Sequence, residues 1–460
     1  MPRPMRSLLK RVSGRMSLHM PAAQGRAPFR TFSPYRWDTT ELPVTDDLYR
    51  ATGAIAEAEQ LAARSAHAAA TLMVPGGSTA GLHAMLLYAC KRGDAVVLPR
   101  NVHLSCLNLC ATAGLTPVFA EPSFTADGLL YTTPGAYAEA LDAHPEATAA
   151  LTLHGDYYGL LPDLAAIAHE THARGRLLLC DEAHGAYFNW RNDIPNAGEC
   201  GADLFVQSAH KTLPALTPGA WLHASPGVDA DRLRAMLRMV QTSSPSFLIM
   251  LSLDEAREWM DQNGQAACKR LGDALRTFHA RAAGLGYSDG QANLPPGMTA
   301  DPLRLVLCAP QGGEQLQRQL QARGIDVEMC DQRRVVCILS LLDGPARLTK
   351  LWKALREITR EPCPRISVVE TECWAPECWP VRRLPIGEAV FAPAEPVPVR
   401  DTAGRVSAVS AGLYPPGVAW LTPGDEVTSQ IAHLLATTPP ERLFGLDADG
   451  RLRCVKKTEL

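Results

Sequence analysis

Residues 177–184 read Leu177-Leu178-Leu179-Cys180-Asp181-Glu182-Ala183-His184, an apolar run that ends at once in an acid. A run that is apolar at every position is typical of a strand buried on both faces, as in a parallel sheet covered by helices. Comparable runs occupy residues 95–98, 117–119, 149–153, 204–206 and 220–222. Before the quoted run, residues 163–174 carry apolar side chains at helical spacing. This alternation of strands and helices predicts an α/β domain with a mainly parallel sheet.

The remainder of the chain changes its pattern twice. Residues 254–260 and 267–283 predict long helices, and the chain after Pro295-Pro296 predicts a second, smaller α/β unit. Its expected strands are residues 303–308 and 335–339, and its expected helices are residues 315–323 and 345–358. A stretch rich in Pro and Cys, residues 362–380, precedes a final segment. We therefore predict an N-terminal arm at 1–50, a large domain at 51–290, a small α/β domain at 291–362 and a C-terminal domain at 363–460.

Composition excludes several classes of protein. Apolar residues make up 46% of the chain and charged residues 20%, which indicates a folded protein. With 45 basic and 48 acidic residues the net charge is −3, which argues against nucleic acid as a partner. No apolar run approaches the ~18–20 residues that span a bilayer, so we expect a soluble protein without a membrane partner. Thirteen scattered cysteines favour a reducing cytoplasm, and the basic first twenty residues favour a short amphipathic arm over a transit peptide.

Three candidate motifs lack the neighbouring residues that their functions require. The tetrad 181–184 spells the signature of a nucleic-acid-stimulated ATPase, but such enzymes need a phosphate loop with a Gly-Lys pair, which this chain lacks. His169 and His172 are three residues apart rather than the four of a zinc helix, and Cys373 and Cys378 have no histidine nearby. We therefore expect no metal site.

Polar residues at three predicted strand ends suit a single ligand. Ser78 and Thr79, in a glycine-rich segment that opens a helix, can donate to an anion such as a phosphate. Lys211 follows the strand at 204–206, and a lysine in a dry site can form a Schiff base with a carbonyl cofactor. Asp181 can pair with the ring nitrogen of pyridoxal phosphate and keep it protonated. Together these residues predict a pyridoxal 5'-phosphate site.

The same residues belong to a longer series of motifs. In chain order these are Gly76 to Gly81, Pro99-Arg100-Asn101-Val102-His103, Asp181 to Gly185, Ser208 to Lys211, Ser243-Ser244-Pro245-Ser246 and Tyr414-Pro415-Pro416-Gly417. From about residue 18 to 435 the chain resembles the bacterial ornithine/lysine/arginine decarboxylase family. The resemblance implies the aspartate-aminotransferase fold, fold type I, with a smaller α/β domain and a C-terminal domain of that family.

The resemblance also implies a role for individual residues. Lys211 resembles the lysine that bonds to the cofactor aldehyde, and Asp181 resembles the acid on the pyridine nitrogen. His103 resembles the imidazole that stacks on the cofactor ring, while Ala183 and His184 are expected near its other face and the reacting carbon. Lys211 or His184 would return a proton to that carbon.

Other positions are implied as anchors. The expected phosphate anchors are Ser78, Thr79, Ser208 and His210. Ser244, with Ser243, resembles the group contributed by a neighbouring subunit, which requires a homodimer or a higher homo-oligomer with a shared active site. Asp425 is expected to hold the distal cation of the substrate, and it stands where the family more often has Glu.

The implied activity is decarboxylation of a basic amino acid, arginine, lysine or ornithine, to an amine of polyamine biosynthesis. One departure keeps alternatives open. The family usually has His-x-Pro-Gly-His-Lys-Gly near its start, whereas this chain has Ala22-Ala23-Gln24 in place of Gly-His-Lys. A different reaction of the same cofactor, by an aminotransferase, a lyase or an oxidative enzyme of specialised metabolism, is the first alternative. A non-catalytic regulatory homologue is the second.

Overall fold

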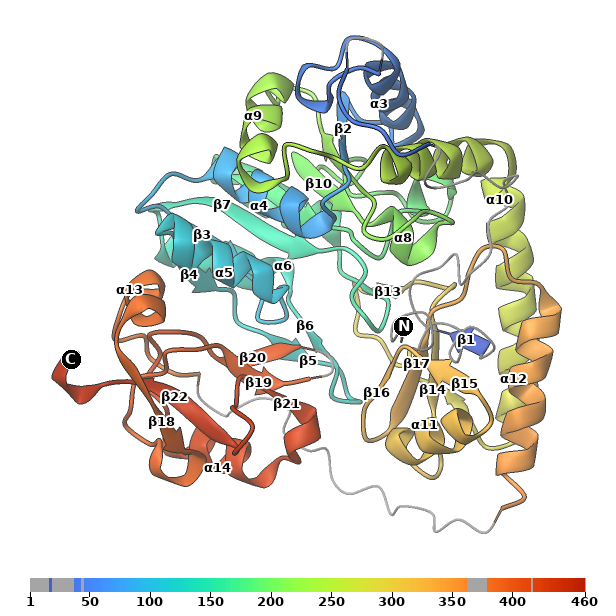
Figure 1. The fold of residues 1–460 in the computed structure, drawn as a ribbon. Coiled ribbons are helices and arrows are strands. Elements are labelled where there is room, and N and C mark those ends of the chain that lie inside the picture. Colours follow the sequence, from blue (N-terminus) through green and yellow to red (C-terminus); the bar gives the residue numbers. More distant parts are fainter. Residues whose placement is uncertain (1–15, 19–36, 43–44, 362–378, 415–416, 460) are drawn as a thin grey trace, which may run out of the picture.

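A seven-stranded sheet forms the centre of the largest part of the molecule (Figure 1). The computed structural model describes residues 16–18, 37–42, 45–361, 379–414 and 417–459. The strands, in their order across the sheet, are β2 (Ala70–Val74), β11 (Ala220–Ala224), β10 (Leu204–Gln207), β9 (Leu177–Asp181), β7 (Ala147–Leu153), β3 (Ala95–Leu98) and β4 (Thr116–Phe119). Strand β11 is antiparallel to both of its neighbours and the other pairs are parallel. The predicted mainly parallel α/β sheet is confirmed.

Helices cover both faces of this sheet, which explains why its strands are apolar throughout. In β9, Leu179 packs in one buried cluster with α4, α5 and α9. Its neighbours Leu178 and Cys180 point to the opposite face, into a cluster with α6 and α7. The helices are α4 (Ser78–Ala89), α5 (Leu104–Ala113), α6 (Pro134–Ala143), α7 (Leu164–Ala173) and α9 (Ala230–Val240).

The long helix α10 (Phe247–Ala283) differs from the sequence prediction of two separate helices. Gly264 lies in the expected break, but it is buried, and a Cβ there would lie 3.1 Å from Cβ of Trp190. The glycine therefore serves close packing between α10 and η2 (Phe188–Trp190) rather than ending a helix. Strand β2 was also missed. Helix α3 (Ala54–Ser65) leads into it.

The smaller α/β unit is present as predicted. Its sheet has the order β12 (Ser288–Asp289), β14 (Leu305–Cys308), β17 (Arg334–Cys337) and β16 (Met329–Cys330), with helices α11 (Gly313–Ala322) and α12 (Pro345–Ile358). Near the N-terminus, β1 (Met16–Leu18) pairs in parallel with β15 (Ile325–Val327). Residues of the expected arm thus join the small unit.

A third part of the molecule lies C-terminal to these two (Figure 1, orange to red). It contains α13 (Ile386–Phe391), β18 (Ala394–Pro398), β19 (Ala411–Leu413), β20 (Val418–Leu421), α14 (Ser429–Thr437), β21 (Leu443–Phe444) and β22 (Arg451–Val455). The expected boundaries between domains stay a prediction. The arm motif at 19–25 and the pair Cys373 and Cys378 lie outside the described residues.

Short elements complete the described chain. They are η1 (Leu48–Arg50), β5 (Ser123–Phe124), β6 (Leu130–Tyr131), β8 (Leu160–Leu161), α8 (Ala209–Thr212), β13 (Thr299–Ala300), η3 (Val399–Asp401), η4 (Pro440–Arg442) and η5 (Lys457–Glu459). Within the described ranges, no helix is both long and apolar enough to cross a membrane.

Candidate active site

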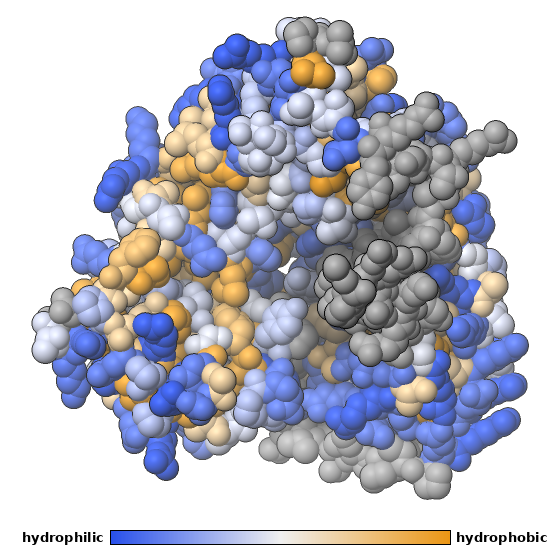
Figure 2. Space-filling view, viewed as in Figure 1, coloured by the Kyte–Doolittle hydropathy of each residue, from blue (hydrophilic) through white to orange (hydrophobic). Residues whose placement is uncertain are grey.

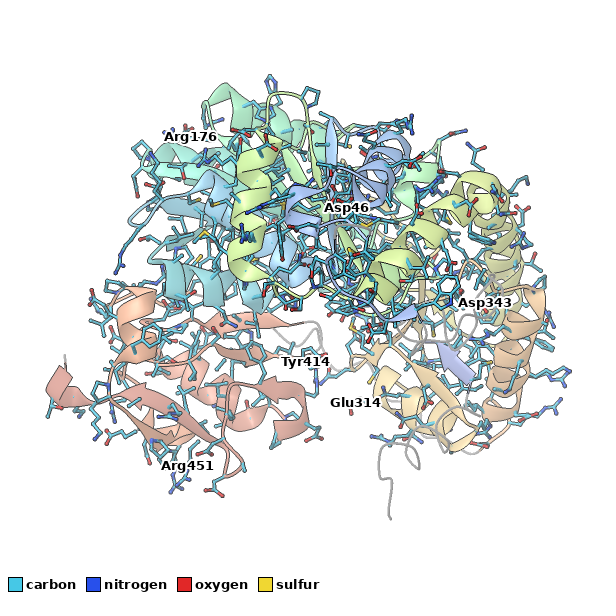
Figure 3. The ribbon with its side chains drawn as sticks, turned by 45° about the horizontal axis from the view of Figure 1, so that its top comes forward. Asp46, Arg176, Glu314, Asp343, Tyr414 and Arg451 are labelled. Carbon is cyan, nitrogen blue, oxygen red and sulfur yellow. The ribbon has the colours of Figure 1, made fainter. Side chains whose placement is uncertain are left out.

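A cavity of about 200 Å³ lies at the carboxyl ends of the central strands. Residues that follow β3, β7, β9 and β10 line it, as do three residues from the C-terminal part, Tyr414, Gly417 and Val418. Figure 3 shows Tyr414 on the side of the C-terminal part that faces the rest of the molecule. The face of the molecule seen in Figure 1 is hollowed near its middle, as the space-filling view shows (Figure 2). The position agrees with the rule that ligands of such sheets bind beyond the carboxyl ends of the strands.

Lys211 reaches the cavity from α8, the single turn that follows β10. Its Nζ lies 3.2 Å from Nε2 of His184 and 6.0 Å from the ring centre of Tyr157. Burial lowers the pKa of Lys211, and the negative charges of Asp181 and Glu328 oppose this shift. A lysine with a lowered pKa is more often neutral, and only the neutral amine attacks a carbonyl.

Asp181 ends β9 and lines the same cavity, with 7% of the residue exposed. Its Oδ1 accepts a hydrogen bond of 3.0 Å from the backbone N–H of Ala183. Its backbone carbonyl accepts another of 3.0 Å from the N–H of His154. These bonds fix both the end of the strand and the direction of the carboxylate.

A buried polar network lies directly behind Asp181. Glu182 is fully buried, with Oε1 2.6 Å from Nδ1 of His154 and Oε2 accepting a 2.5 Å hydrogen bond from Nε2 of Gln207. Gln207 in turn lies 3.1 Å from Nε2 of His223, whose Nδ1 is 2.7 Å from Oγ1 of Thr71. Burial raises the pKa of Glu182, while His154 opposes the shift. The network ties the residue that follows β9 to β10, β11 and β2, so it stabilises the strand end that carries Asp181.

His103 and His184 bring two imidazoles to the cavity. His103 caps α5, with Nδ1 2.8 Å from Oγ of Ser105, which holds the ring in one orientation. His184 packs against Tyr157, with ring centres 4.9 Å apart. Burial lowers the pKa of His184 well below its usual value, and the neighbouring Lys211 charge lowers it further. His184 is therefore neutral near pH 7. Ala183 also lines the cavity.

Of the four expected phosphate anchors, only Ser78 and Ser208 are hydrogen-bonded to each other. Oγ of Ser208 donates a 2.8 Å hydrogen bond to Oγ of Ser78, which lies at the start of α4. Thr79 is exposed in the next position, and His210 instead places Nδ1 3.1 Å from the carbonyl of Gly219. The described lining of the cavity includes none of these four residues. Their role toward a phosphate stays a prediction.

Ser243 and Ser244 lie on the surface before α10, away from the lining of the described cavity. Their exposure leaves them accessible to another chain, and their contribution to a neighbour's site stays a prediction.

Asp425 is buried and does not belong to the lining of the described cavity. It is 2% exposed in the C-terminal part, where Oδ2 accepts hydrogen bonds of 2.8 Å from the backbone N–H and the hydroxyl of Thr422. Its Oδ1 lies 3.4 Å from Nε of Arg382. The carboxylate thus already has a cation and two hydrogen-bond donors within the C-terminal part, and its contact with a substrate stays a prediction.

Sequence reasoning also missed residues that the fold brings in. Asp156 and Tyr157 line the cavity after β7, and their place at a strand end was a signal that could have identified them. Arg304, from the small unit, places Nη2 3.3 Å from Nδ1 of His184. No local pattern marks Arg304, because only the tertiary fold brings it to the site.

Comparisons with known proteins agree with this arrangement. The family model described as the major domain of Orn/Lys/Arg decarboxylase matches residues 31–282, and the model of its C-terminal domain matches residues 386–443. The chain is 33% identical over 416 residues to an uncharacterized protein of Bacillus subtilis, YaaO, covering 87% of this chain and 85% of that protein. It is 29% identical to an arginine decarboxylase of the same organism, covering 85% and 83%.

Solved structures show the same fold. Lysine decarboxylase A from Pseudomonas aeruginosa superposes with a TM-score of 0.78 at 19% identity, over 98% of this chain and 82% of that one. An alanine–glyoxylate aminotransferase from Nostoc covers 66% of this chain and 86% of its own, with a TM-score of 0.52 and 17% identity. The fold is therefore that of the type I pyridoxal-phosphate enzymes, and the chain belongs to the Orn/Lys/Arg decarboxylase family of amino-acid decarboxylases.

Proposed function

We propose that this protein uses pyridoxal 5'-phosphate to decarboxylate a basic amino acid, arginine, lysine or ornithine, to the corresponding amine. One observation carries the proposal: a lysine with a lowered pKa, Lys211, and an acid, Asp181, line the same cavity between two imidazoles. This set fits the cofactor, because it offers an amine for the aldehyde, a carboxylate for the ring nitrogen and flat groups for the ring.

The cofactor would be held by Lys211, Asp181 and His103, and the hydroxyls of Ser78 and Ser208, which are hydrogen-bonded to each other, are the proposed donors to its phosphate. When bound, it supplies a protonated ring that accepts the electron pair left by departing CO₂. Asp181 contributes a fixed negative charge that keeps the ring nitrogen protonated. The hydrogen bond from Ala183 holds that charge in place before any ligand arrives.

His184 and Lys211 are the groups that can move protons in this cavity. Nε2 of His184 and Nζ of Lys211 lie 3.2 Å apart, within hydrogen-bond distance of each other. Burial lowers the pKa of both groups, so His184 is neutral and the amine of Lys211 loses its proton more readily than that of an exposed lysine. We assign the return of a proton to the substrate carbon to this pair.

Arginine is the first substrate to test, because four of the curated relatives are named arginine decarboxylases and match at 28–31% identity. The cavity also has groups that suit a distal cation. Tyr157 and Tyr414 offer aromatic faces, and Asp156 offers a carboxyl. The proposed place of the product in metabolism is polyamine biosynthesis, and the proposed location is the cytoplasm.

The test is to incubate the purified protein and pyridoxal phosphate with arginine, lysine and ornithine and to identify the products by mass. We expect CO₂ and one amine in equal amounts from one of the three. A keto acid or H₂O₂ would instead support another reaction of the same cofactor. Bound cofactor without turnover of any amino acid would support a non-catalytic regulatory role.

A homodimer or higher homo-oligomer with a shared site is part of the proposal. Analytical ultracentrifugation tests it. A species with the mass of a single chain that is fully active would contradict it.

A further inference from the structure

Arg304, a buried arginine of the small unit, contacts the outer edge of the His184 ring. Only 3% of the residue is exposed, and it lies directly before β14. Its Nη2 is 3.3 Å from Nδ1 of His184, while Nε2 on the opposite side of the ring is 3.2 Å from Nζ of Lys211. Arg304 is not part of the described cavity lining. It therefore lies behind His184, in a row that ends at Lys211.

The direction of each hydrogen bond in this row follows from what each group can do. A guanidinium has only donors and stays charged in proteins, so Nδ1 of His184 must accept from Arg304. A neutral imidazole with an accepting Nδ1 carries its proton on Nε2. That Nε2–H then faces Nζ of Lys211, and an amine can accept a hydrogen bond only through the lone pair of its neutral form.

We propose that Arg304 is a positioning residue: it fixes the Nε2–H form of His184 and through it favours the neutral amine of Lys211, ready for a carbonyl ligand. The benefit to the enzyme rests on the proposed function, because only a carbonyl cofactor needs such an amine. The hydrogen-bond row itself does not depend on that function.

The positive charges around the row favour the neutral forms of His184 and Lys211, whereas the carboxylates of Asp181 and Glu328 oppose this at Lys211. His184 faces Lys211, Arg304, His210 and His103, and these neighbours add to the effect of burial in lowering its pKa. Lys211 faces Asp181 and Glu328, which raise its pKa, and Arg304, which lowers it, with burial as the largest cause of the net lowering. Protonation of His184 would also place a second donor against Arg304, so this ring stays neutral.

The structure holds Arg304 in place from the large domain. Asp301, at the start of the same loop, accepts a hydrogen bond from the hydroxyl of Tyr187, and its N–H donates 2.8 Å to the carbonyl of Gly159. A Cβ on Gly159 would lie 2.8 Å from Cβ of Arg304, so only glycine leaves room for the arginine there. These contacts join the small unit to the loop after β7 and aim Arg304 at His184.

The test measures the reactivity of Lys211 in the full-length chain freed of cofactor. Acetic anhydride acetylates only neutral amines, so mass spectrometry of the Lys211 peptide across pH reports how far that amine is neutral. We expect Arg304→Met to move the profile to higher pH by about one unit, which is about tenfold slower acetylation at a given pH. Arg304→Gln, whose shorter side chain does not reach His184, should shift the acetylation profile in the same way. It replaces the methionine variant if that variant does not fold.

A double-mutant cycle separates action through His184 from a direct effect of charge. His184→Phe alone should raise the profile to a similar extent, and adding Arg304→Met should then change the rate less than about twofold. The proposal is overturned if adding Arg304→Met to His184→Phe shifts the profile by a further full unit, or if neither Arg304 variant alone shifts it. Arg334→Met, at an equally buried arginine of the same unit that pairs with Asp331, controls for general loosening.

The two proposals fail separately. The acetylation profile needs no cofactor and no turnover, so it can support the role of Arg304 even if pyridoxal phosphate does not bind. Loss of cofactor binding in the native chain would contradict only the proposed function.

Discussion

Asp181 and Lys211 come from neighbouring strands, β9 and β10, and meet because those strands are parallel and end at the same edge. Their roles differ in kind. In the proposed function, Lys211 supplies a reactive amine, whereas Asp181 supplies the charge that would pair with the ring nitrogen of the bound cofactor. Substitutions at the two positions should therefore have different effects on binding and on turnover.

Asp181→Asn should keep the cofactor attached to Lys211 but lower kcat about 10²-fold or more, because the amide cannot hold the ring nitrogen protonated. Steady-state kinetics and the visible spectrum of the same preparation measure both properties. Asp193→Asn, at an exposed acid paired with Arg191, is the matched control and should behave as the native chain. Unchanged kcat in Asp181→Asn would refute the assigned role.

Asp425→Asn should lower stability by about 2 kcal/mol and leave KM unchanged, because the carboxylate already neutralises Arg382. Urea unfolding and substrate titration measure the two quantities. A higher KM with unaltered unfolding would instead support the contact with the distal cation that the sequence suggests.

The sequence pointed to Lys211 and Asp181 by their places at the ends of short apolar strands, a signal visible in local pattern, and the family resemblance added His103 and His184. The sequence could not identify Arg304 or the buried surroundings of Asp425. The place of Arg304 depends on His184, 120 residues away, and that of Asp425 on Arg382, from a different segment of the C-terminal part. Local sequence periodicity does not reveal such contacts.

At the scale of elements, helix α10 shows that two glycines of one helix can have different effects on stability. Gly264 and Gly272 lie about two turns apart in the same helix, where glycine is an unfavourable residue at either position. Only the packing distinguishes them: a Cβ at Gly264 would lie 2.8 Å from Cε of Met260 and 3.1 Å from Cβ of Trp190, whereas one at Gly272 would meet nothing closer than 3.7 Å.

Gly264→Ala should therefore destabilise the protein by about 1–3 kcal/mol, since the added methyl overfills the contact with Trp190. Gly272→Ala should stabilise it by about 0.5–1 kcal/mol, since alanine loses less entropy in a helix. Thermal or urea unfolding of the pair compares them in one host helix. Equal effects of the same sign would show that the packing difference does not matter.

The loop between β7 and β8 contains a carboxyl that should make stability depend on pH. Burial raises the pKa of Asp156 from its usual 3.8 to about 6, although the backbone N–H of Leu160 donates to it at 2.8 Å. Between about pH 4 and 6 the folded state retains this proton while the unfolded chain has lost it. Stability from this group is therefore fully present below about pH 4 and is lost as pH rises toward 6.

Asp156→Asn should remove that dependence and make the protein more stable than the native chain above pH 6, by up to about 3 kcal/mol. Urea unfolding at pH 4.5 and pH 7 measures it. Parallel curves for the variant and the native chain at both pH values would contradict the raised pKa.

At the scale of the whole molecule, two parts of the chain line the cavity and the small unit supports it from behind. The central sheet supplies the reactive groups, the small unit supplies Arg304 behind His184, and the C-terminal part supplies Tyr414. The sequence predicted the two α/β units and the separate C-terminal segment, because their strands and helices have clear local patterns. It did not predict how the parts close over the site, because closure depends on long-range packing.

The central claim is that Lys211 is the residue that binds the carbonyl cofactor in this cavity. Reducing the native protein with borohydride in the presence of pyridoxal phosphate, followed by peptide mass mapping, tests it directly. We predict one pyridoxyl group on the peptide that contains Lys211, together with a visible absorption band that Lys211→Ala abolishes. Modification of a different lysine, or a band that survives in Lys211→Ala, would contradict the account.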